Sequence, residues 1–459
     1  MKYISTRNNS KEYSFEEVFV KGLADDGGLF VPKSLKKFSN QELSLMSKLN
    51  YQDLAGKIIF PFIGDFMSEK QLSDIIQKSY SVFRKEEVVS FVKIGNINIL
   101  ELFHGPTLAF KDIAMQLLGN FYEYYLKKNS KKINVIVATS GDTGAAAIDA
   151  IKGKKNMNIF VLHPHNRISI VQRKLMSTIK DNNVFNIAIE GNFDDCQNLV
   201  KSMFSDIEFS SLINMSGVNS INWARIISQA VYYFYAYFLL NNNKQINFSV
   251  PTGNFGDVYA GYLSKKMGLP IDRLIVATNQ NDILHRAITN GRYEAEPVVE
   301  TTSPSMDIQI ASNFERLIYD LNNQNDSETD KIMTDIKKKG KFIISKEKLL
   351  RIKKDFLSAK INETEVLRII KETYKKNKII LDPHTAIGFG ASKTKDLEGD
   401  IVSLATAHPC KFPDAIDRSI NFIPSLPDEL KYVMDEKENY DIISNNLDEV
   451  KQYIKNRAK

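Results

Sequence analysis

The chain has 459 residues, a formal net charge of +6, a hydrophobic fraction of 43% and a charged fraction of 25%. This length is too great for one compact core and predicts two or three domains, and the composition is that of a globular protein rather than a disordered or fibrous one. The positive residues are scattered along the chain, so we do not expect nucleic-acid binding.

The N-terminus, the apolar runs and the cysteines indicate the compartment. The first ten residues contain no apolar signal segment, and the most apolar helix-like stretch, residues 231–240, is too short to cross a bilayer. The two cysteines, Cys196 and Cys410, fit neither a disulfide framework nor a zinc spacing, and no histidine pair has a metal-ligand spacing. We therefore expect a cytoplasmic protein with no membrane contact and no catalytic metal.

In chain order, a helical segment is predicted first and an alternating segment second. Residues 1–80 predict mainly helix, interrupted by a turn at residues 25–28 and an irregular run at residues 30–32. From about residue 95 to residue 300, short apolar runs alternate with helical patterns, which is typical of a mostly parallel sheet. The expected strands are residues 133–138, 158–162, 184–189, 246–250 and 273–278.

The last third of the chain is predicted to be more mixed. Residues 322–330 are polar and predict a loop, and residues 331–378 predict highly charged helices. Residues 379–381 and 401–405 are apolar and predict two further strands.

Lys111 is the first candidate for chemistry. It follows a Gly-Pro turn and the apolar residues 108–110, and it begins a long helical pattern. Burial of its stem would lower the pKa of the amine, and a neutral amine is what a Schiff base with a carbonyl compound requires. The alternative is a lysine at a helix start whose head reaches water. Two further segments favour the catalytic interpretation.

Both segments have the order strand, small turn, helix. In residues 139–144, Thr-Ser-Gly-Asp-Thr-Gly, backbone N–H groups, the helix dipole and the hydroxyls of Ser140 and Thr143 suit a carboxylate. The alternative is an ordinary turn capped by Ser140 or Asp142. In residues 253–257, the glycines allow close approach of a phosphate, but the lysine of a P-loop and the spacing of a Rossmann motif are missing. A lysine, a carboxylate loop and a phosphate cup together indicate pyridoxal phosphate bound with an amino acid.

With these motifs the chain resembles the threonine synthase family, in its longer form with an N-terminal extension, within the fold-type II group of pyridoxal-phosphate enzymes. The matching segments keep the family's order from residue 22 to residue 412. They are residues 22–32, 101–112, 139–144, 219–222, 253–257, 303–309, 382–386 and 405–412.

The resemblance implies a fold and an activity. The expected fold is α/β and similar to tryptophan synthase β, with two lobes of mostly parallel sheet over residues 81–459 and a helical N-terminal segment over residues 1–80. The expected enzyme is a lyase, monomeric or homodimeric, that converts O-phospho-L-homoserine and water to L-threonine and phosphate in threonine biosynthesis. The alternatives are a phospho-lyase that releases 2-oxobutyrate from the same substrate and a cofactor-binding relative without turnover.

The resemblance also assigns roles to residues. Lys111 would hold the cofactor and move protons, and Thr406, at the end of the strand 401–405, would donate to the pyridine nitrogen unless it is only a strand-end threonine. Lys411 is a candidate for the substrate phosphate because it is close to Thr406 in sequence. The substrate carboxylate is expected at Ser140, Gly141 and Thr143. The cofactor phosphate is expected at Gly253, Asn254, Phe255, Gly256 and Asp257.

Two departures from the wider fold group agree with the threonine synthase family but weaken any argument taken from that wider group, and the roles of three histidines stay open. Asp142 stands where many members of the wider fold group have asparagine, and the phosphate cup has only two glycines. The histidines that lie in matching segments could position a phosphate or a proton, or could cap turns. They are His104, His384 and His408.

Overall fold

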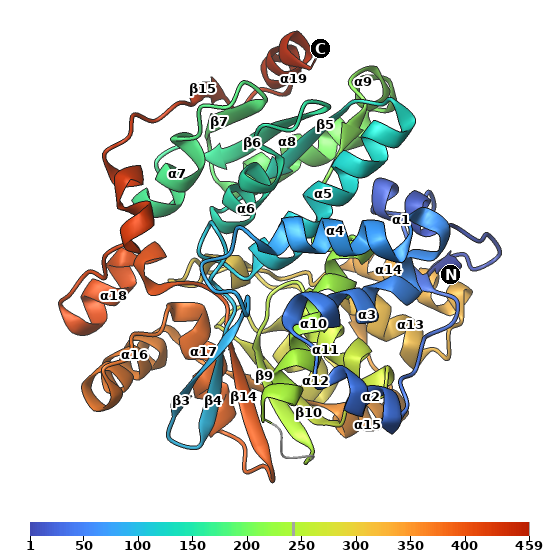
Figure 1. Cartoon of the computed structure of the whole chain (residues 1–459), viewed down its shortest axis with the longest axis vertical. Coiled ribbons are helices and arrows are strands. Elements are labelled where there is room, and N and C mark those ends of the chain that lie inside the picture. Colours follow the sequence, from blue (N-terminus) through green and yellow to red (C-terminus); the bar gives the residue numbers. More distant parts are fainter. Residues whose placement is uncertain (241–243, 459) are drawn as a thin grey trace.

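The computed structural model describes residues 1–240 and 244–458. Over this part of the chain there are two lobes, each built on a sheet (Figure 1). The larger sheet, below in Figure 1, has the order β13-β10-β9-β14-β4-β3, and the smaller sheet, above, has the order β15-β7-β6-β5-β8. All neighbouring strands in these two sheets are parallel except β3 and β4. This confirms the predicted α/β class with two mostly parallel sheets.

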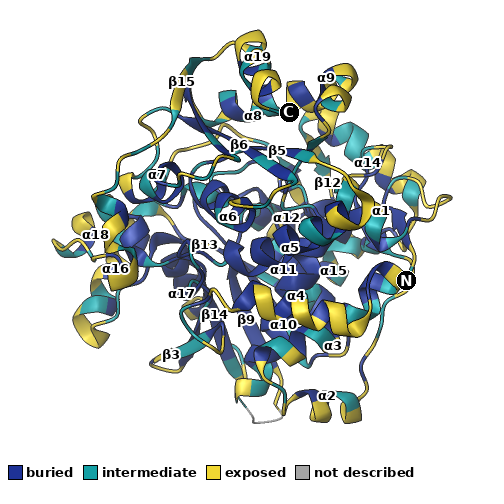
Figure 2. Cartoon of the chain, turned by 45° about the horizontal axis from the view of Figure 1, so that its top comes forward, coloured by how far each residue is buried: buried dark blue, intermediate teal, exposed yellow. Residues whose placement is uncertain are grey.

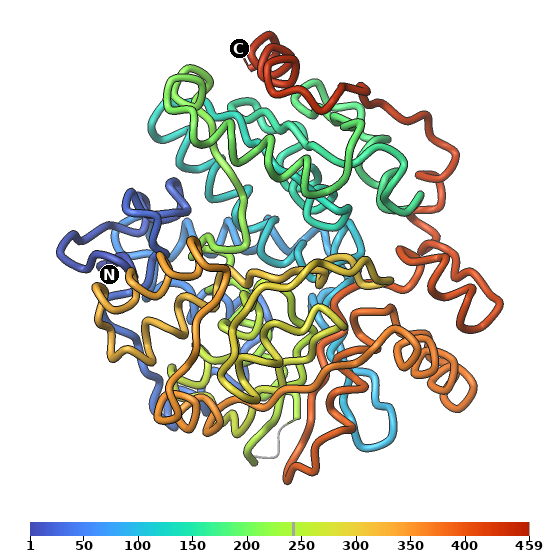
Figure 3. The backbone as a smooth tube through the Cα atoms, turned by 180° about the vertical axis from the view of Figure 1, so that it is seen from behind, coloured from blue at the N-terminus to red at the C-terminus, as the bar shows by residue number. Residues whose placement is uncertain are grey.

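The chain crosses between the lobes several times. The strands of the larger sheet are β3 (Ser90–Ile94), β4 (Ile97–Glu101), β9 (Ile246–Pro251), β10 (Ile271–Thr278), β13 (Phe356–Lys360) and β14 (Asp400–Ala405). Those of the smaller sheet are β5 (Ile133–Ala138), β6 (Met157–Pro164), β7 (Val184–Glu190), β8 (Met215–Ser216) and β15 (Asp441–Ser444). Figure 3 shows the last crossing, in red, where the chain runs along the outer edge of the molecule to β15.

Helices cover both faces of the sheets, as parallel strands require. On the smaller sheet lie α5 (Lys111–Asn129), α6 (Asp142–Ile151), α7 (Ile170–Ser177), α8 (Phe193–Ser205), α9 (Ile207–Leu212) and α19 (Leu447–Arg457). The larger lobe holds α10 (Trp223–Leu240), α11 (Gly256–Lys266), α12 (Ile283–Asn290), α13 (Phe314–Leu321), α14 (Asp326–Lys339), α15 (Lys346–Asp355), α16 (Glu363–Asn377), α17 (Pro383–Lys393) and α18 (Pro413–Ile420). None of the helices in the described part of the chain combines the length and apolarity that a bilayer span demands.

Residues 1–80 form α1 (Phe15–Lys21), α2 (Asn40–Met46), α3 (Tyr51–Ile63), α4 (Glu69–Tyr80) and the short η1 (Gly64–Phe66). Short side elements elsewhere are η2 (Pro304–Met306), η3 (Pro409–Lys411), η4 (Asp428–Met434) and the antiparallel pair β11 (Arg292–Glu294) and β12 (Lys341–Ile343). The interior strands and the helices α5 and α11 are buried, whereas the outer faces of α16 and α19 are exposed (Figure 2).

The expected strands at residues 133–138, 158–162, 184–189, 246–250, 273–278 and 401–405 are all present, and four other expectations are wrong. Residues 30–32 form a strand, β2 (Phe30–Pro32), which pairs with β1 (Tyr3–Ser5). Residues 379–381 form no strand, because the chain turns at Lys378 (φ 60°) and continues into α17. Residues 326–330 are helical because Asn325 caps α14, and β12 and β13 interrupt the helices of residues 331–378.

The N-terminal segment shares one hydrophobic core with both lobes. Tyr3 packs edge-on against Trp223 of α10, and Asn222 donates to the carbonyl of Phe19 at 2.8 Å. The buried guanidinium of Arg316 donates to Phe30 O at 3.0 Å, to Ile221 O at 2.6 Å and to Asn313 Oδ1. Arg316 thus joins β2, the start of α10 and the start of α13.

Replacement of Arg316 by Met should lower the free energy of unfolding by about 3 kcal/mol or more, because buried carbonyl oxygens lose their donor. The matched control is Arg368→Met, which removes an exposed helix-surface pair with Glu372 and should cost less than about 0.5 kcal/mol. Chemical denaturation of both variants tests this; equal losses would contradict the role of Arg316 as an anchor.

Candidate active site

Lys111 is the first residue of α5 and its side chain is buried. Its Nζ lies 3.1 Å from Ser305 Oγ and 3.5 Å from Asp142 Oδ2. Burial lowers the pKa of Lys111, the charges of Lys411 and Arg225 lower it further, and Asp142 acts in the opposite direction. The structure therefore provides the buried amine that the sequence predicts.

The turn before Lys111 is fixed by one carboxylate. Asp112 accepts from the backbone N–H of Thr107 at 2.8 Å and from its hydroxyl at 2.5 Å. A Cβ on Gly105 would come within 2.4 Å of the Asp112 Cβ, so only glycine fits there. Burial raises the pKa of Asp112 to about 7. Asp112 and Gly105 thus fix the conformation of the turn from which the Lys111 side chain extends.

The loop between β5 and α6 has the geometry of an anion site. Gly141 has φ 132°, and the hydroxyl of Thr139 accepts from the N–H groups of Gly141 and Gly144, both at 2.9 Å. Ser140 and Thr143 are half-buried beside the start of α6, and they remain predicted ligands of the carboxylate. Sequence analysis did not single out Thr139, whose hydroxyl holds the turn.

Asp142, the first residue of α6, is surrounded by donors. Lys411 Nζ lies 2.6 Å from its Oδ1, and Gln172 donates to the same oxygen at 2.9 Å. Although burial opposes ionisation, the lysine charges hold the pKa of this carboxyl far below its usual range. Asp142 is therefore a buried anion between Lys111 and Lys411.

The phosphate cup lies between β9 and α11. Phe255 has φ 63°, and α11 begins at the next residue with its N-terminus at the turn. A Cβ on Gly253 would lie 2.8 Å from Ser305 O, and one on Gly256 would lie 3.1 Å from Asn313 Nδ2. The segment that carries Ser305 and Asn313 thus closes one side of the cup, and sequence analysis assigned it no role in the site.

The end of α11 nearest the cup is also anchored by side chains. The backbone of Asn254 accepts from the N–H of Asn313 at 3.1 Å. The Asp257 side chain accepts from the hydroxyls of Tyr232 at 2.5 Å and Tyr233 at 2.8 Å, so it holds α11 against α10. Asn254 and Asp257 stay predicted cofactor residues through their backbone N–H groups, and the amide of Asn254 stays a further predicted donor.

Thr406 lies beside the Lys111 turn. Its carbonyl accepts from the N–H of Phe110 at 2.9 Å, and its N–H donates to the hydroxyl of Thr385 at 3.3 Å. Lys411, a few residues further, is fully buried, and its Nζ also donates to Thr107 O at 2.8 Å. The fold thus brings the turn before Lys111, Thr406 and Lys411 together.

Arg225 is a residue of this site that sequence analysis missed. It lies in the first turn of α10, it is buried, and it donates to Val218 O at 3.0 Å. Its Nε is buried and has no hydrogen-bond partner among the described residues. Burial lowers the pKa of Arg225 to about 10. A buried guanidinium without a carboxylate partner suits an anionic ligand. The only sequence signal was its place just after residues 219–222.

The three histidines differ in what they contact. His104 Nε2 lies 3.1 Å from Glu101 Oε2 and 3.0 Å from Ser90 Oγ, and His408 Nδ1 lies 2.9 Å from Cys410 Sγ. Burial lowers the pKa of His408 to about 4. His384 Nδ1 lies 2.9 Å from Asp382, while its Nε2 is buried and unpartnered among the described residues. Of the three, His384 alone presents a buried nitrogen without a described partner.

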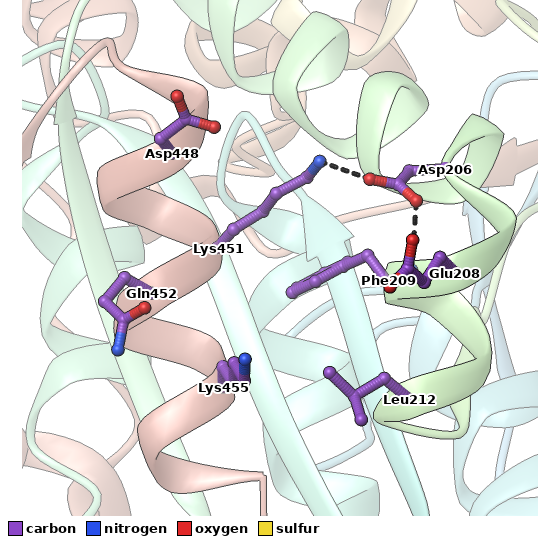
Figure 4. A pocket seen from close by; sticks show the side chains of 8 residues that line it. All are labelled: Asp206, Glu208, Phe209, Leu212, Asp448, Lys451, Gln452 and Lys455. Atoms are coloured by element: carbon purple, nitrogen blue, oxygen red, sulfur yellow. Dashed lines mark hydrogen bonds and ion pairs between the residues drawn. The ribbon is translucent and has the colours of Figure 1, made fainter.

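A surface cavity of about 310 Å³ lies elsewhere, between α9 and α19 (Figure 4). Its central ion pair joins Lys451 and Asp206 at 2.6 Å, with both side chains partly exposed. Within the described residues no group of three or more histidine, cysteine or acidic side chains is placed to hold a metal ion.

A buried lysine amine, a helix-start cup that a Cβ would obstruct and a turn at the N-terminus of a second helix fit pyridoxal phosphate, and together with the two-sheet fold they define a pyridoxal-phosphate-dependent enzyme. Residues 95–407 match the family described as pyridoxal-phosphate dependent enzyme, residues 2–80 the threonine synthase N terminus and residues 385–454 the threonine synthase C-terminal family. The chain belongs to the threonine synthase family.

Individual relatives agree over nearly the whole length. The chain is 43% identical to threonine synthase of Pseudomonas aeruginosa, over 99% of this chain and 98% of that protein. A solved structure of threonine synthase with bound pyridoxal phosphate, from Brucella melitensis, has a TM-score of 0.97 at 43% identity and covers all of both chains. The yeast threonine synthase structure has a TM-score of 0.94 at 41% identity, over 99% of this chain and 98% of that chain.

Replacement of Gly253 by Ala should weaken binding of pyridoxal phosphate about tenfold or more, because the new methyl group forces the backbone at Ser305 to move. Titration of the cofactor-free protein with the cofactor measures this. Gly56→Ala is the control, since its Cβ would meet only Ile76 at 3.9 Å. Equal affinities of both variants would place the phosphate elsewhere.

The Asp257 carboxyl predicts a pH dependence of stability. Burial raises its pKa to about 6, above the ~3.9 of an unfolded aspartate. Its contribution to stability is therefore complete below pH ~4 and is lost as the pH rises through 6. Asp257→Asn retains an oxygen that can accept from both tyrosine hydroxyls but does not titrate. When the pH rises from ~5 to ~7.5, the free energy of unfolding of the unsubstituted protein should fall by about 1 kcal/mol more than that of Asp257→Asn. Denaturation at both pH values tests this; parallel losses would contradict it.

Proposed function

We propose that this protein is a threonine synthase that converts O-phospho-L-homoserine and water to L-threonine and phosphate. The observation that carries the proposal is one buried amine, Lys111, with three separate places for an anion around it. The cup at residues 253–257 would take the cofactor phosphate. The loop at residues 139–144 would take the substrate carboxylate, and Arg225 would take the substrate phosphate.

The residues of this chain would have separate roles in the reaction. When bound, pyridoxal phosphate withdraws electrons from the amino acid and makes its Cα and Cβ protons removable. The Lys111 amine, whose pKa is lowered by burial, is placed to take the Cα proton and to return protons along the carbon chain. Ser305 Oγ, at 3.1 Å, orients this amine. In the net reaction the Cγ–O bond breaks, water supplies the oxygen at Cβ, Cγ becomes a methyl group and phosphate leaves with one proton.

Thr406 would face the pyridine nitrogen. A hydroxyl can donate to an unprotonated nitrogen but cannot hold it protonated as a carboxylate would. Its backbone bond to Phe110 keeps its position fixed relative to Lys111. A ring that withdraws electrons less strongly suits a reaction that must proceed beyond Cα to Cβ and Cγ.

The deciding experiment is incubation of the purified protein with O-phospho-L-homoserine and identification of the product. L-threonine and phosphate in equal amounts are expected; 2-oxobutyrate would show the phospho-lyase instead, and no turnover would show a non-catalytic relative.

Lys111→Ala should lower kcat by a factor of about 10³ or more. Borohydride reduction followed by peptide mapping should find the cofactor on Lys111. An adduct on another lysine would overturn the assignment.

The role of Arg225 can be separated from that of the cup. Arg225→Met should raise KM for O-phospho-L-homoserine by a factor of about 10² while cofactor content is retained, because a charge-assisted bond to the leaving phosphate is lost. Arg286→Met, which removes a guanidinium paired with Asp282 at 2.8 Å, is the control. Loss of cofactor with unchanged KM would place Arg225 at the cofactor phosphate.

The compartment and the assembly state belong to the proposal as well. The two cysteines are buried and free, which fits the cytoplasmic location inferred from the sequence. A monomer or a homodimer is expected, and sedimentation of the cofactor-loaded protein would distinguish them.

A further inference from the structure

The loop proposed for the substrate carboxylate contains a carboxylate of its own. Asp142 follows Gly141 directly, and its side chain is buried. An uncompensated anion in this place would repel a carboxylate ligand and would bind the Lys111 ammonium, which keeps an amine protonated. The site can work only if the charge of Asp142 is neutralised by another group.

Lys411 provides that charge. Its Nζ lies 2.6 Å from Asp142 Oδ1, and no part of its side chain is exposed. Gln172 donates to the same oxygen at 2.9 Å, so Oδ1 is engaged twice, while Oδ2 faces Lys111 at 3.5 Å. The two oxygens of Asp142 thus serve different partners.

The position of Lys411 is fixed at both ends of the residue. Its backbone carbonyl accepts from Ser169 Oγ at 2.8 Å, and Ser169 caps α7, the helix that carries Gln172. Its ammonium also donates to Thr107 O at 2.8 Å, in the turn that precedes Lys111. To reach a substrate phosphate, Lys411 would have to leave both Asp142 and Thr107.

We propose that Lys411 is a positioning residue: it neutralises Asp142 and holds it at the start of α6, so that the adjacent loop accepts a carboxylate and Lys111 stays free to react. This inference rests on the proposed function and replaces the role in phosphate binding that sequence proximity indicated for Lys411. Arg225, whose Nε lacks a described partner, is left as the ligand of the substrate phosphate.

The test is a double-mutant cycle with Lys411→Met, Asp142→Asn and both substitutions together, in the full-length protein. Three quantities are measured: the unfolding temperature without cofactor, the pH midpoint of the visible absorbance change of the cofactor-loaded protein, and KM for the substrate. Lys451→Met is the control, because Lys451 forms an ion pair of the same length, 2.6 Å, with Asp206 in the distant cavity (Figure 4).

Each single variant leaves one buried charge without its partner, and the double variant leaves neither. Lys411→Met should raise the absorbance midpoint and Asp142→Asn should lower it, each by about one pH unit, because the charge beside Lys111 changes in opposite directions. Lys411→Met should raise KM about tenfold, and in the double variant KM should return most of the way to that of the unsubstituted protein. The double variant should also have a higher unfolding temperature than either single variant.

Three results would overturn the proposal. The first is a double variant whose unfolding temperature does not exceed that of the more stable single variant. If the single variants do not fold, a double variant that also does not fold gives the same result. The second is a KM that stays as high in the double variant as in Lys411→Met, which is expected of a direct phosphate ligand. A shift of any of the three quantities in Lys451→Met as large as in Lys411→Met would likewise count against it. The unfolding and absorbance measurements do not involve substrate, so failure of the proposed function, seen as no threonine from the unsubstituted protein, remains distinguishable.

Discussion

The carboxylate of Asp142 is the point on which the geometry of the site depends. It lies at the start of α6 on the smaller sheet, as Lys111 lies at the start of α5, while Lys411 follows β14 of the larger sheet. A buried ion pair is stable only when geometry and hydrogen bonding are nearly complete, and loss of one partner is costly. Through Lys411 the buried ion pair therefore joins the larger sheet to the start of α6.

Several other residues of the site lie in turns that follow the strands of the two sheets. The strands β4, β9 and β14 run parallel in the larger sheet, β5 lies in the smaller sheet, and each of the four is followed by a turn that contributes to the site. Ligands of open parallel sheets bind outside the carboxyl ends of the strands, where helix N-termini supply backbone donors. In the proposed function, two such N-termini, those of α6 and α11, would each bind an anion, and the buried Arg225 would bind a third.

Sequence could predict what is local. Lys111 and the turns at residues 139–144 and 253–257 were found because strand, small turn and helix are encoded by neighbouring residues. Arg225, Ser305 and the pair of Lys411 with Asp142 were not, because their partners are distant in sequence and a buried arginine looks in sequence like any helix arginine. The apolar residues 379–381 were misjudged for a related reason: burial in a loop ahead of a capped helix leaves the same pattern as a short strand.

The anchoring of the N-terminal segment has a consequence for synthesis of the chain. Residues 1–80 carry apolar side chains that pack against residues much later in the sequence. These later residues include Trp223 and the region around Arg316. At about 5–20 residues per second, the segment waits on the order of 10–50 s after its own completion before residue 316 has been made. During that time its apolar surface is open to other nascent chains. A chaperone that binds such surfaces would have its greatest effect on the yield of this protein during that part of translation, before residue 316 has been made.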